Sequence, residues 1–350
     1  MPPQFVSVIV PVRNEERFLE ATLRALLRQH YPADAFEVLV VDGQSHDGTI
    51  AVVRRLQHEF RNLRLLYNPR RLSSAGRNIG VRHARGEFVV VIDGHCELQN
   101  RDYLRDLVEV FESRHVECVG RPQPLDVSGA SALQSAIALA RGSRLGHNPG
   151  SHIYSDEGGY VPPQSVAVAY QRDVFARVGY FDEAFDACED VEFNHRLAKS
   201  GMRCYLAPEL TVRYHPRGSL AGLCYQMLRY GRGRARLLVK HPDTFAVAPL
   251  VPALFLLTLT MSFALGLVAP PFAGLFCLTV LAYCWTVMVA ALLLGVRGRA
   301  LRLTPLMPIV FLSIHVGAGW GVLRELGPVV PKMGLKLVRP VLRRLRVVSA

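Results

Sequence analysis

Three polar segments follow apolar, β-branched runs in the first hundred residues, and their side chains are of kinds that bind ligands. They read PVRNE at residues 11–15, DGQSHDGT at residues 42–49 and DGH at residues 93–95. Asp42 ends its apolar run directly, so its carboxylate can accept hydrogen bonds from a base or a ribose. For the polar side chains of residues 45–49, the capping of a following helix is the favoured interpretation.

Such a site requires strands whose carboxyl ends meet at one edge of a sheet. Short β-branched runs alternate with amphipathic helical patterns, which is typical of βαβ units with a parallel sheet. The expected strands cover residues 5–10, 37–42, 63–67 and 88–93, and the expected helices cover residues 16–28, 49–60 and 73–84. Because ligands bind beyond the carboxyl ends of strands in open α/β sheets, the three polar segments are expected to lie together. Further on, a polar stretch with glycine and proline at residues 142–163 predicts a mobile active-site loop.

Taken together, these segments resemble glycosyltransferase family 2. The resemblance continues through AGRNIG at residues 75–80, GYFD at residues 179–182 and CEDVEFNHRL at residues 188–197, and it covers roughly residues 5–240. Several separate motifs in the right order are far more specific than any one of them. The resemblance implies an α/β fold of the GT-A type, in which a Rossmann-like mixed sheet binds a nucleotide-diphosphate-sugar, followed here by C-terminal transmembrane helices.

The resemblance also implies which residues bind the donor nucleotide and a divalent metal, manganese or magnesium. The implied donor-binding residues are Pro11, Asn14, Glu15, Asp42, Arg77, Asn78 and Asp93. Asp93 corresponds to the metal and ribose contact of an Asp-x-Asp motif whose third position here is His95. Histidine shifts the preference towards manganese, although magnesium and a role of His95 in diphosphate binding stay open. His215 is a further candidate metal ligand, with a capped surface histidine as the alternative.

Inversion at the sugar carbon requires a base that takes the proton of the acceptor hydroxyl as it attacks. Glu189 and Asp190 match the Glu-Asp motif of the family, which implies that Asp190 is the base and that Glu189 orients the site. Capping of the helix expected at residues 191–200 is the alternative. The segment QMLRY resembles the Gln-x-x-Arg-Trp motif of processive synthases and implies contacts of Gln226, Arg229 and Tyr230 with the acceptor and the diphosphate.

The C-terminal third is apolar enough to enter a membrane. No Asp, Glu, Lys or Arg occurs from Thr244 through Val296, which is long enough for two crossings of roughly 20 residues each and excludes an ordinary soluble protein. The expected spans cover about residues 246–268, 272–295 and 304–323. The expected organisation is a cytoplasmic glycosyltransferase domain at residues 1–242, a membrane region at residues 243–324 and a basic tail at residues 325–350.

The net charge of +12, from 41 basic and 29 acidic residues, gathers beside these apolar segments. Basic clusters at residues 229–240, 297–302 and 332–346 favour binding to the membrane surface over binding to nucleic acid. All three clusters prefer the cytoplasm, but three complete spans would place the tail outside. Either the third segment is therefore re-entrant, or the tail violates the rule. The glycines of residues 313–321 suit close packing or a break, and His315 is uncommon at such depth.

Two further observations favour a cytoplasmic catalytic domain. The first seven residues have no basic region followed by a long apolar one, so no cleavable signal sequence is expected. The seven cysteines show no CxxC pairs and no paired zinc spacing, and reduced thiols are the expected state. The expected location is the inner or plasma membrane, with several spans and the catalytic domain on the cytoplasmic face.

The resulting hypothesis is an inverting, metal-dependent hexosyltransferase whose resemblance is greatest to the succinoglycan-type branch of the family. It would move a sugar from a nucleotide-diphosphate-sugar, with UDP the commonest carrier in the family, to a lipid-linked saccharide in exopolysaccharide or cell-wall glycan biosynthesis. The expected partners are this donor, this acceptor and membrane lipids, and no nucleic acid.

Three other classes of protein were weighed against this hypothesis. A processive polysaccharide synthase is disfavoured by tyrosine at position 230 and by the short membrane region, since a channel needs more spans. A catalytically inactive membrane scaffold of the same fold predicts the loss of Asp42, Asp93 or Asp190, yet all three are present. A nicotinamide-dependent enzyme is excluded because the glycine fingerprint is absent after the first strand.

Overall fold

The computed structural model describes residues 3–147 and 150–328. The chain divides into two compact units, Met1–Pro216 and Arg217–Ala350, and each is described by itself. The division falls earlier than the expected boundary near residue 242, because the basic helix after residue 219 belongs to the same unit as the apolar helices.

The first unit contains an eight-stranded mixed sheet in the order β3-β2-β1-β4-β8-β6-β9-β7. The strands are β1 (Val6–Val12), β2 (Phe36–Asp42), β3 (Leu63–Tyr67), β4 (Phe88–Val91), β6 (Cys118–Gly120), β7 (Gly159–Val161), β8 (Ala167–Gln171) and β9 (Cys204–Leu206). Strand β1 pairs in parallel with β2 and β4, and β2 pairs in parallel with β3. Strand β8 runs antiparallel to both β4 and β6, so the sheet is mixed, as expected.

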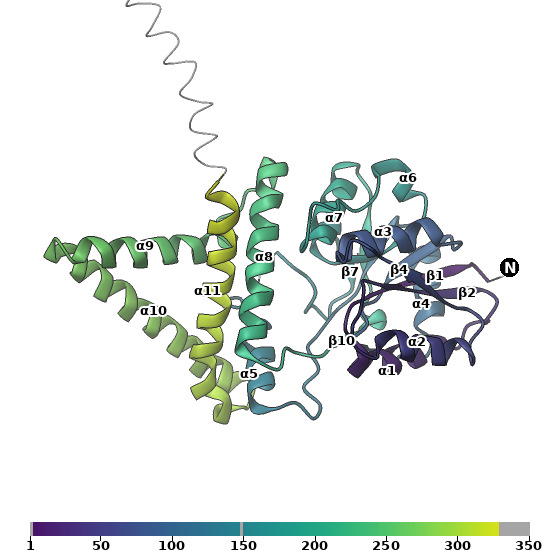
Figure 1. Cartoon of the computed structure of the whole chain (residues 1–350), viewed down its shortest axis with the longest axis horizontal. Helices are drawn as coiled ribbons and strands as arrows, with labels where there is room; N and C mark the ends of the chain where they lie inside the picture. Colours follow the sequence, from purple (N-terminus) through teal and green to yellow (C-terminus); the bar gives the residue numbers. More distant parts are fainter. Residues whose placement is uncertain (1–2, 148–149, 329–350) are drawn as a thin grey trace, which may run out of the picture. The chain divides into compact units, whose positions relative to one another are not determined.

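Alternating apolar side chains of these strands form one core on each face of the sheet. Helices cover both faces (Figure 1). One core packs against α1 (Glu16–Leu27), α2 (Thr49–Gln57) and α4 (Tyr103–Arg114). The other packs against α3 (Ser73–His83), α6 (Val174–Val178) and α7 (Glu189–Lys199). Strand β1 shows the alternation, since Val8 and Val10 face the first core and Ile9 faces the second. Helix α5 (Ala132–Arg141) completes the helices of this unit.

Two local features fix the edge of the sheet at which its parallel strands end. A Cβ atom at Gly80 would overlap the side chain of Ile9, so this glycine lets α3 approach β1 closely. A small second sheet pairs β5 (Cys96–Glu97) with β10 (Arg213–Tyr214) in antiparallel fashion. Its register places Tyr214 opposite Cys96. This pairing brings the C-terminal end of the first unit next to the loop after β4.

The expected elements of the first hundred residues are all present, with ends that differ by one to three residues. Strand β3 has the expected bounds, whereas β4 ends at Val91, two residues before Asp93. The stretch at residues 142–163 differs more, because its end forms β7, which pairs with β9.

The second unit consists of helices α8 (Leu220–Lys240), α9 (Val251–Gly266), α10 (Pro270–Arg297) and α11 (Met307–Leu326). The last three, with the turns that precede α9 and α11, are long and apolar enough to cross a membrane, judged by length and composition. Helix α11 is continuous over residues 313–321, so its glycines make no break there. Most of the expected basic tail, from residue 329 on, lies outside the described residues.

Candidate active site

The loops after β1 and β2 are tied together by backbone-to-side-chain hydrogen bonds. The backbone NH of Asn14 donates to Ser45 Oγ at 2.9 Å, and the NH of His46 donates to Asn14 Oδ1 at 2.9 Å. The NH of Glu15 donates to Thr49 Oγ1 at 2.8 Å. The two loops therefore form one surface. At the start of α2, whose N-cap is Gly48, Asp47 Oδ1 accepts a hydrogen bond from the backbone NH of Thr49 at 3.1 Å.

Asp42 ends β2 and lies buried beneath this surface. Its two carboxylate oxygens lie 3.2 and 3.3 Å from the backbone NH of Ser45, which donates to them. Pro11 lies in β1 near α3, since a Cβ atom on Gly76 would lie 3.4 Å from the Cβ of Pro11. Both residues are thus held rigidly at the edge where the parallel strands end.

Asp93 lies beyond the end of β4 and is held by a residue far along the chain. The hydroxyl of Tyr214 donates to Asp93 Oδ2 at 2.6 Å. Burial opposes ionisation of this carboxyl, but the positive charges of Arg77 and His95 and the tyrosine hydrogen bond together lower the pKa of Asp93. The other oxygen, Oδ1, accepts no hydrogen bond from the residues that the structure describes.

His95 lies beside Asp93 and is oriented by two neighbours. Its Nδ1 is 3.0 Å from Glu15 Oε1, and its ring meets the ring of Tyr214 edge-on, with the centroids 5.5 Å apart. A carboxylate that holds one ring nitrogen fixes the orientation of the imidazole, as in many metal sites. Asp93 and His95 thus offer a hard oxygen and an imidazole on a rigid loop, a donor set that fits a divalent cation such as manganese.

His215 has other neighbours. Its ring stacks on Phe18 with the centroids 4.5 Å apart, and its Nδ1 lies 3.9 Å from Asp126 Oδ2. Within the described part of the chain, neither Asp93, His95 nor His215 belongs to a trio of His, Cys, Asp or Glu whose ligand atoms all lie within 4.8 Å. The role of His215 as a metal ligand therefore stays a prediction without a preassembled site.

A buried cluster of opposite charges lies between α3 and the start of α7. Arg77 Nε lies 3.4 Å from Glu189 Oε1, and the side chains are 13% and 6% exposed. Burial opposes the charge on Arg77, but the carboxylates of Glu189, Asp190 and Asp93 raise its pKa. Burial, together with the charge of Asp190, raises the pKa of Glu189 although Arg77 acts in the opposite direction. Arg77 thus links Asp93, the predicted metal ligand, with Asp190, the predicted base, and Glu189, which is predicted to orient the site.

The start of α7 shows how this pair is presented. Glu189 is the first residue of the helix, and Cys188 before it has a left-handed backbone with a φ of 62° and makes no side-chain cap. Asp190 Oδ1 accepts a hydrogen bond from the NH of Val191 at 2.8 Å. Asp190 is therefore engaged with its own helix while it remains in the electrostatic reach of Arg77.

Asn78 uses its amide group to hold the segment before α7. Its Nδ2 donates to the carbonyl of Phe181 at 2.9 Å and to Glu183 Oε1 at 2.8 Å, while its Oδ1 accepts from the NH of Phe181 at 2.9 Å. The guanidinium of Arg77 lies over the ring of Phe181, 5.5 Å from its centroid. Any donor contact of Asn78 would have to share an amide that already fixes the surroundings of Arg77.

Two residues of the site were absent from the sequence prediction. Arg121 is fully buried, donates to Tyr103 Oη at 2.9 Å and to the carbonyl of Val91 at 3.1 Å, and helps to lower the pKa of Asp93. It follows β6 directly, but a strand of three residues gives no periodic signal by which its end could have been located. Tyr214 carried no such signal, because its hydrogen bond to Asp93 spans 121 residues of sequence.

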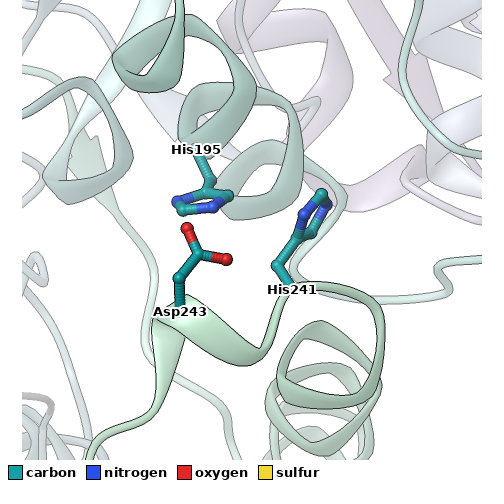
Figure 2. Close-up of side chains that lie close together, drawn as sticks. All are labelled: His195, His241 and Asp243. Carbon is teal, nitrogen blue, oxygen red and sulfur yellow. The ribbon is translucent and has the colours of Figure 1, made fainter.

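The remaining predicted residues belong to the second unit. Gln226, Arg229 and Tyr230 lie on α8. Figure 2 shows His241 and Asp243, which follow α8, and His195, which projects from α7 of the first unit. Because these three side chains come from different units, we assign no metal site to them.

The hydrogen bond from Tyr214 leads to a first prediction. Tyr214→Phe removes one hydrogen bond to an ionised group, and we expect kcat/KM for the donor to fall about tenfold or more without loss of thermal stability. The matched control is Tyr160→Phe, because Tyr160 is 60% exposed and its hydroxyl donates to the carbonyl of Arg114. Steady-state kinetics of both variants test this, and equal activities would remove Tyr214 from the site.

Comparison with known proteins places this site in a class. The sequence profile of Glycosyl transferase family 2 matches residues 7–178. The chain is 33% identical over 236 residues to the Succinoglycan biosynthesis protein ExoA of Rhizobium meliloti, covering 67% of this chain and 70% of that protein. It is 27% identical over 270 residues to the Dolichyl N-acetyl-alpha-D-glucosaminyl phosphate 3-beta-D-2,3-diacetamido-2,3-dideoxy-beta-D-glucuronosyltransferase of Methanococcus voltae, covering 75% and 82%.

The fold agrees with this result. The mannosyltransferase PcManGT of Pyrobaculum calidifontis, solved in complex with GDP-Man and Mn²⁺, superposes with a TM-score of 0.56 at 25% identity, covering 91% of this chain and 88% of that one. The protein is a glycosyltransferase with a GT-A fold, for which a divalent metal is typical. More narrowly, the chain belongs to glycosyltransferase family 2.

Proposed function

We propose that the protein is an inverting, metal-dependent enzyme that moves a single sugar from a nucleotide-diphosphate-sugar to a lipid-linked saccharide. The observation that carries this proposal is the buried cluster of Arg77, Glu189 and Asp190 beside Asp93. It supplies, at one edge of the sheet, a carboxylate for the donor side and a carboxylate pair for the acceptor side. Direct displacement at a sugar carbon needs a site that stabilises the leaving diphosphate and a base that takes the proton of the acceptor hydroxyl.

Asp190 is proposed as the base. It takes the proton from the acceptor hydroxyl as the oxygen attacks the sugar carbon, so that the new bond forms on the face opposite the departing diphosphate. Glu189 is engaged by Arg77, whose Nε lies 3.4 Å from Glu189 Oε1. This contact leaves Asp190 as the carboxylate that is available to accept a proton, while Arg77 holds the pair in place.

Asp93 and His95 are proposed to hold the metal and the donor diphosphate. A divalent cation bound there neutralises the negative charge that develops on the leaving diphosphate. Tyr214 and Glu15 contribute by fixing Asp93 and His95, so that little reorganisation accompanies donor binding. Asp42, with Pro11 and Asn14, is proposed to line the nucleotide subsite, and Gln226, Arg229 and Tyr230 the acceptor and diphosphate.

The acceptor and the setting are proposed from the second unit and from the relatives. Helices α9 and α10 expose apolar side chains over most of their length, which suits an enzyme whose acceptor is anchored in a membrane. One relative is named for succinoglycan biosynthesis and another for a dolichyl phosphate acceptor. Exopolysaccharide or cell-wall glycan assembly at the cytoplasmic face of the membrane is therefore the proposed role, and no nucleic acid takes part.

The test is a transfer assay on the full chain in detergent, with a panel of UDP- and GDP-sugars, a polyprenyl-diphosphate-linked acceptor, and manganese, magnesium or EDTA. We expect one donor to be used in a metal-dependent reaction that Asp93→Ala reduces by about 10³-fold or more, as for loss of a group that stabilises developing charge. Asp173→Asn is the matched control, since that carboxylate is 58% exposed and pairs with Arg177 of the following helix.

The mass of the product separates the proposal from its alternatives. Addition of one sugar supports the single-sugar transferase, whereas a ladder of masses would favour a processive synthase. Absence of both transfer and donor hydrolysis with every donor would favour a scaffold of the same fold.

A further inference from the structure

We infer that the second unit enters the bilayer from one face only: the α9–α10 hairpin dips into the hydrocarbon with its turn buried there, and α8 and α11 lie along the membrane surface. The sequence alone predicted three spans, with a conflict over the side on which the basic tail lies. The packing of the four helices and the chemistry of the hairpin turn resolve this conflict.

Helix α11 is bound to α8 through backbone contacts at glycines. A Cβ atom at Gly317 would overlap the carbonyl oxygen of Cys224, and one at Gly321 would overlap that of Leu228. A Cβ atom at Gly231 would likewise overlap the carbonyl oxygen of Ala318. Because residue numbers rise together along both helices, the two run parallel, as Figure 1 shows. Small residues at such spacing are those that let helices pack closely in membranes.

Ion pairs link the C-terminal parts of α8 and α11. Arg232 Nε lies 3.2 Å from Glu325 Oε2, and Arg236 Nη2 lies 2.7 Å from Glu325 Oε1. The contact between α8 and α11 therefore runs from Cys224 to Arg236, about 18 Å at 1.5 Å per residue. Over that length α11 must follow the direction of α8.

Helix α8 cannot cross a bilayer. It carries five basic residues within its last twelve positions, which are Arg229, Arg232, Arg234, Arg236 and Lys240. Charges at the bilayer centre are costly, whereas a basic helix beside anionic headgroups is stabilised. Since α8 lies along the surface, its parallel partner α11 lies there too. The burial of the helices supports this arrangement. In α11, 50% of the most apolar stretch is buried within the protein, whereas the buried share is 11% in α9 and in α10.

The α9–α10 turn is built for surroundings without water. Leu267 and Val268 are 75% and 81% exposed, and the nearest charged residues in sequence are Asp243 and Arg297, which lie at the base of the hairpin. A turn that emerged on the far side would place these apolar side chains in water. Helix α9 by itself, with 16 residues, is about 24 Å long and reaches the length of a membrane span only with the turn that precedes it.

The backbone of the turn carries the strongest evidence. The NH groups of Val268 and Ala269 both donate to the carbonyl of Leu265, at 3.1 and 2.9 Å. Helix α10 then begins with Pro270 and Pro271, which have no NH, and the NH of Phe272 donates to Ala269 at 3.1 Å. The start of a helix normally leaves four NH groups to be satisfied by water. Here two of these positions are prolines without an NH, and the neighbouring NH groups are already bonded, so none of them needs water. Backbone in hydrocarbon must be satisfied in this way.

A labelling experiment on the full chain tests this topology. Val268→Cys at the turn and, as control, Gly298→Cys at the exposed base would each be treated with a membrane-impermeant maleimide in bacterial spheroplasts, in inverted membrane vesicles and after denaturation in SDS. The wild type, with its seven cysteines, gives the background. We expect residue 268 to be labelled only after denaturation, and residue 298 to be labelled in inverted vesicles and not in spheroplasts.

Each other result overturns the inference. Labelling of residue 268 in spheroplasts would mean that the hairpin crosses the membrane, and labelling in inverted vesicles would mean that the turn is not in the hydrocarbon. Labelling of residue 298 in spheroplasts would reverse the orientation. Leu267→Cys repeats the measurement if Val268→Cys does not accumulate, and the transfer assay on each variant confirms that it is folded. The result is independent of the donor and acceptor proposed above.

Discussion

The Asp190→Asn variant is expected to lose about 10³-fold in kcat while its KM for the donor changes by less than threefold, within the 10²- to 10⁴-fold range of general base catalysis. Asparagine has nearly the same shape as aspartate and keeps an oxygen for the hydrogen bond from the NH of Val191. It cannot accept the proton of the acceptor hydroxyl. The loss should therefore fall on the chemical step rather than on donor binding.

Two comparisons make this result specific. Glu189→Gln keeps the shape of the side chain beside Arg77 and leaves Asp190 in place, so we expect a smaller loss than for Asp190→Asn. Asp173→Asn, an exposed carboxylate on the same unit, should match the wild type. If Asp190→Asn retained more than a tenth of the wild-type kcat, Asp190 would not be the base.

Arg77→Met is expected to destabilise the first unit by about 3–5 kcal/mol and to abolish transfer, because it leaves buried carboxylates without their partner. Arg77 is the cation that lies within ion-pair distance of the buried Glu189, and it also faces Asp190 and Asp93. Methionine keeps most of the length and apolar contact of the arginine stem over Phe181. Thermal unfolding in detergent, measured with and without denaturant, gives the change in free energy.

The double variant Arg77→Met/Glu189→Gln separates charge from packing. If the unpaired carboxylate causes the instability, replacing Glu189 as well should restore more than half of the lost free energy, since contacting residues are not additive. Transfer should stay abolished, because Asp190 and Asp93 would still lack their cation. A single variant as stable as the wild type would show that the cluster does not depend on Arg77.

Sequence periodicity was sufficient for the half of the sheet that is built from regular βαβ units. Strands β1 to β4 are apolar and parallel, and the loops after β1, β2 and β4 carry their polar residues at the expected places. Asp42 and Asp93 could be located for the same reason. Periodicity was insufficient for β6, β7 and β9, which have only three residues each and take their place in the sheet from pairing across long stretches of chain.

The parts of the site that escaped prediction are those set by tertiary contacts. Tyr214 reaches Asp93 because β10 pairs with β5, and a two-residue strand leaves no pattern to read. Donor binding by Asn78 stays a prediction, while its hydrogen bonds to the backbone of Phe181 could not be read from its motif. In the second unit, composition identified apolar helices but could not show that α11 packs along α8.

The anomeric configuration of the product tests the central claim most directly, because a base at Asp190 and direct displacement require inversion at the sugar carbon. Once the donor is known, proton NMR of the transferred sugar in the wild-type product gives its configuration. The account predicts the configuration opposite to that of the donor. Retention would require a covalent or front-face route, and would contradict the role assigned to Asp190.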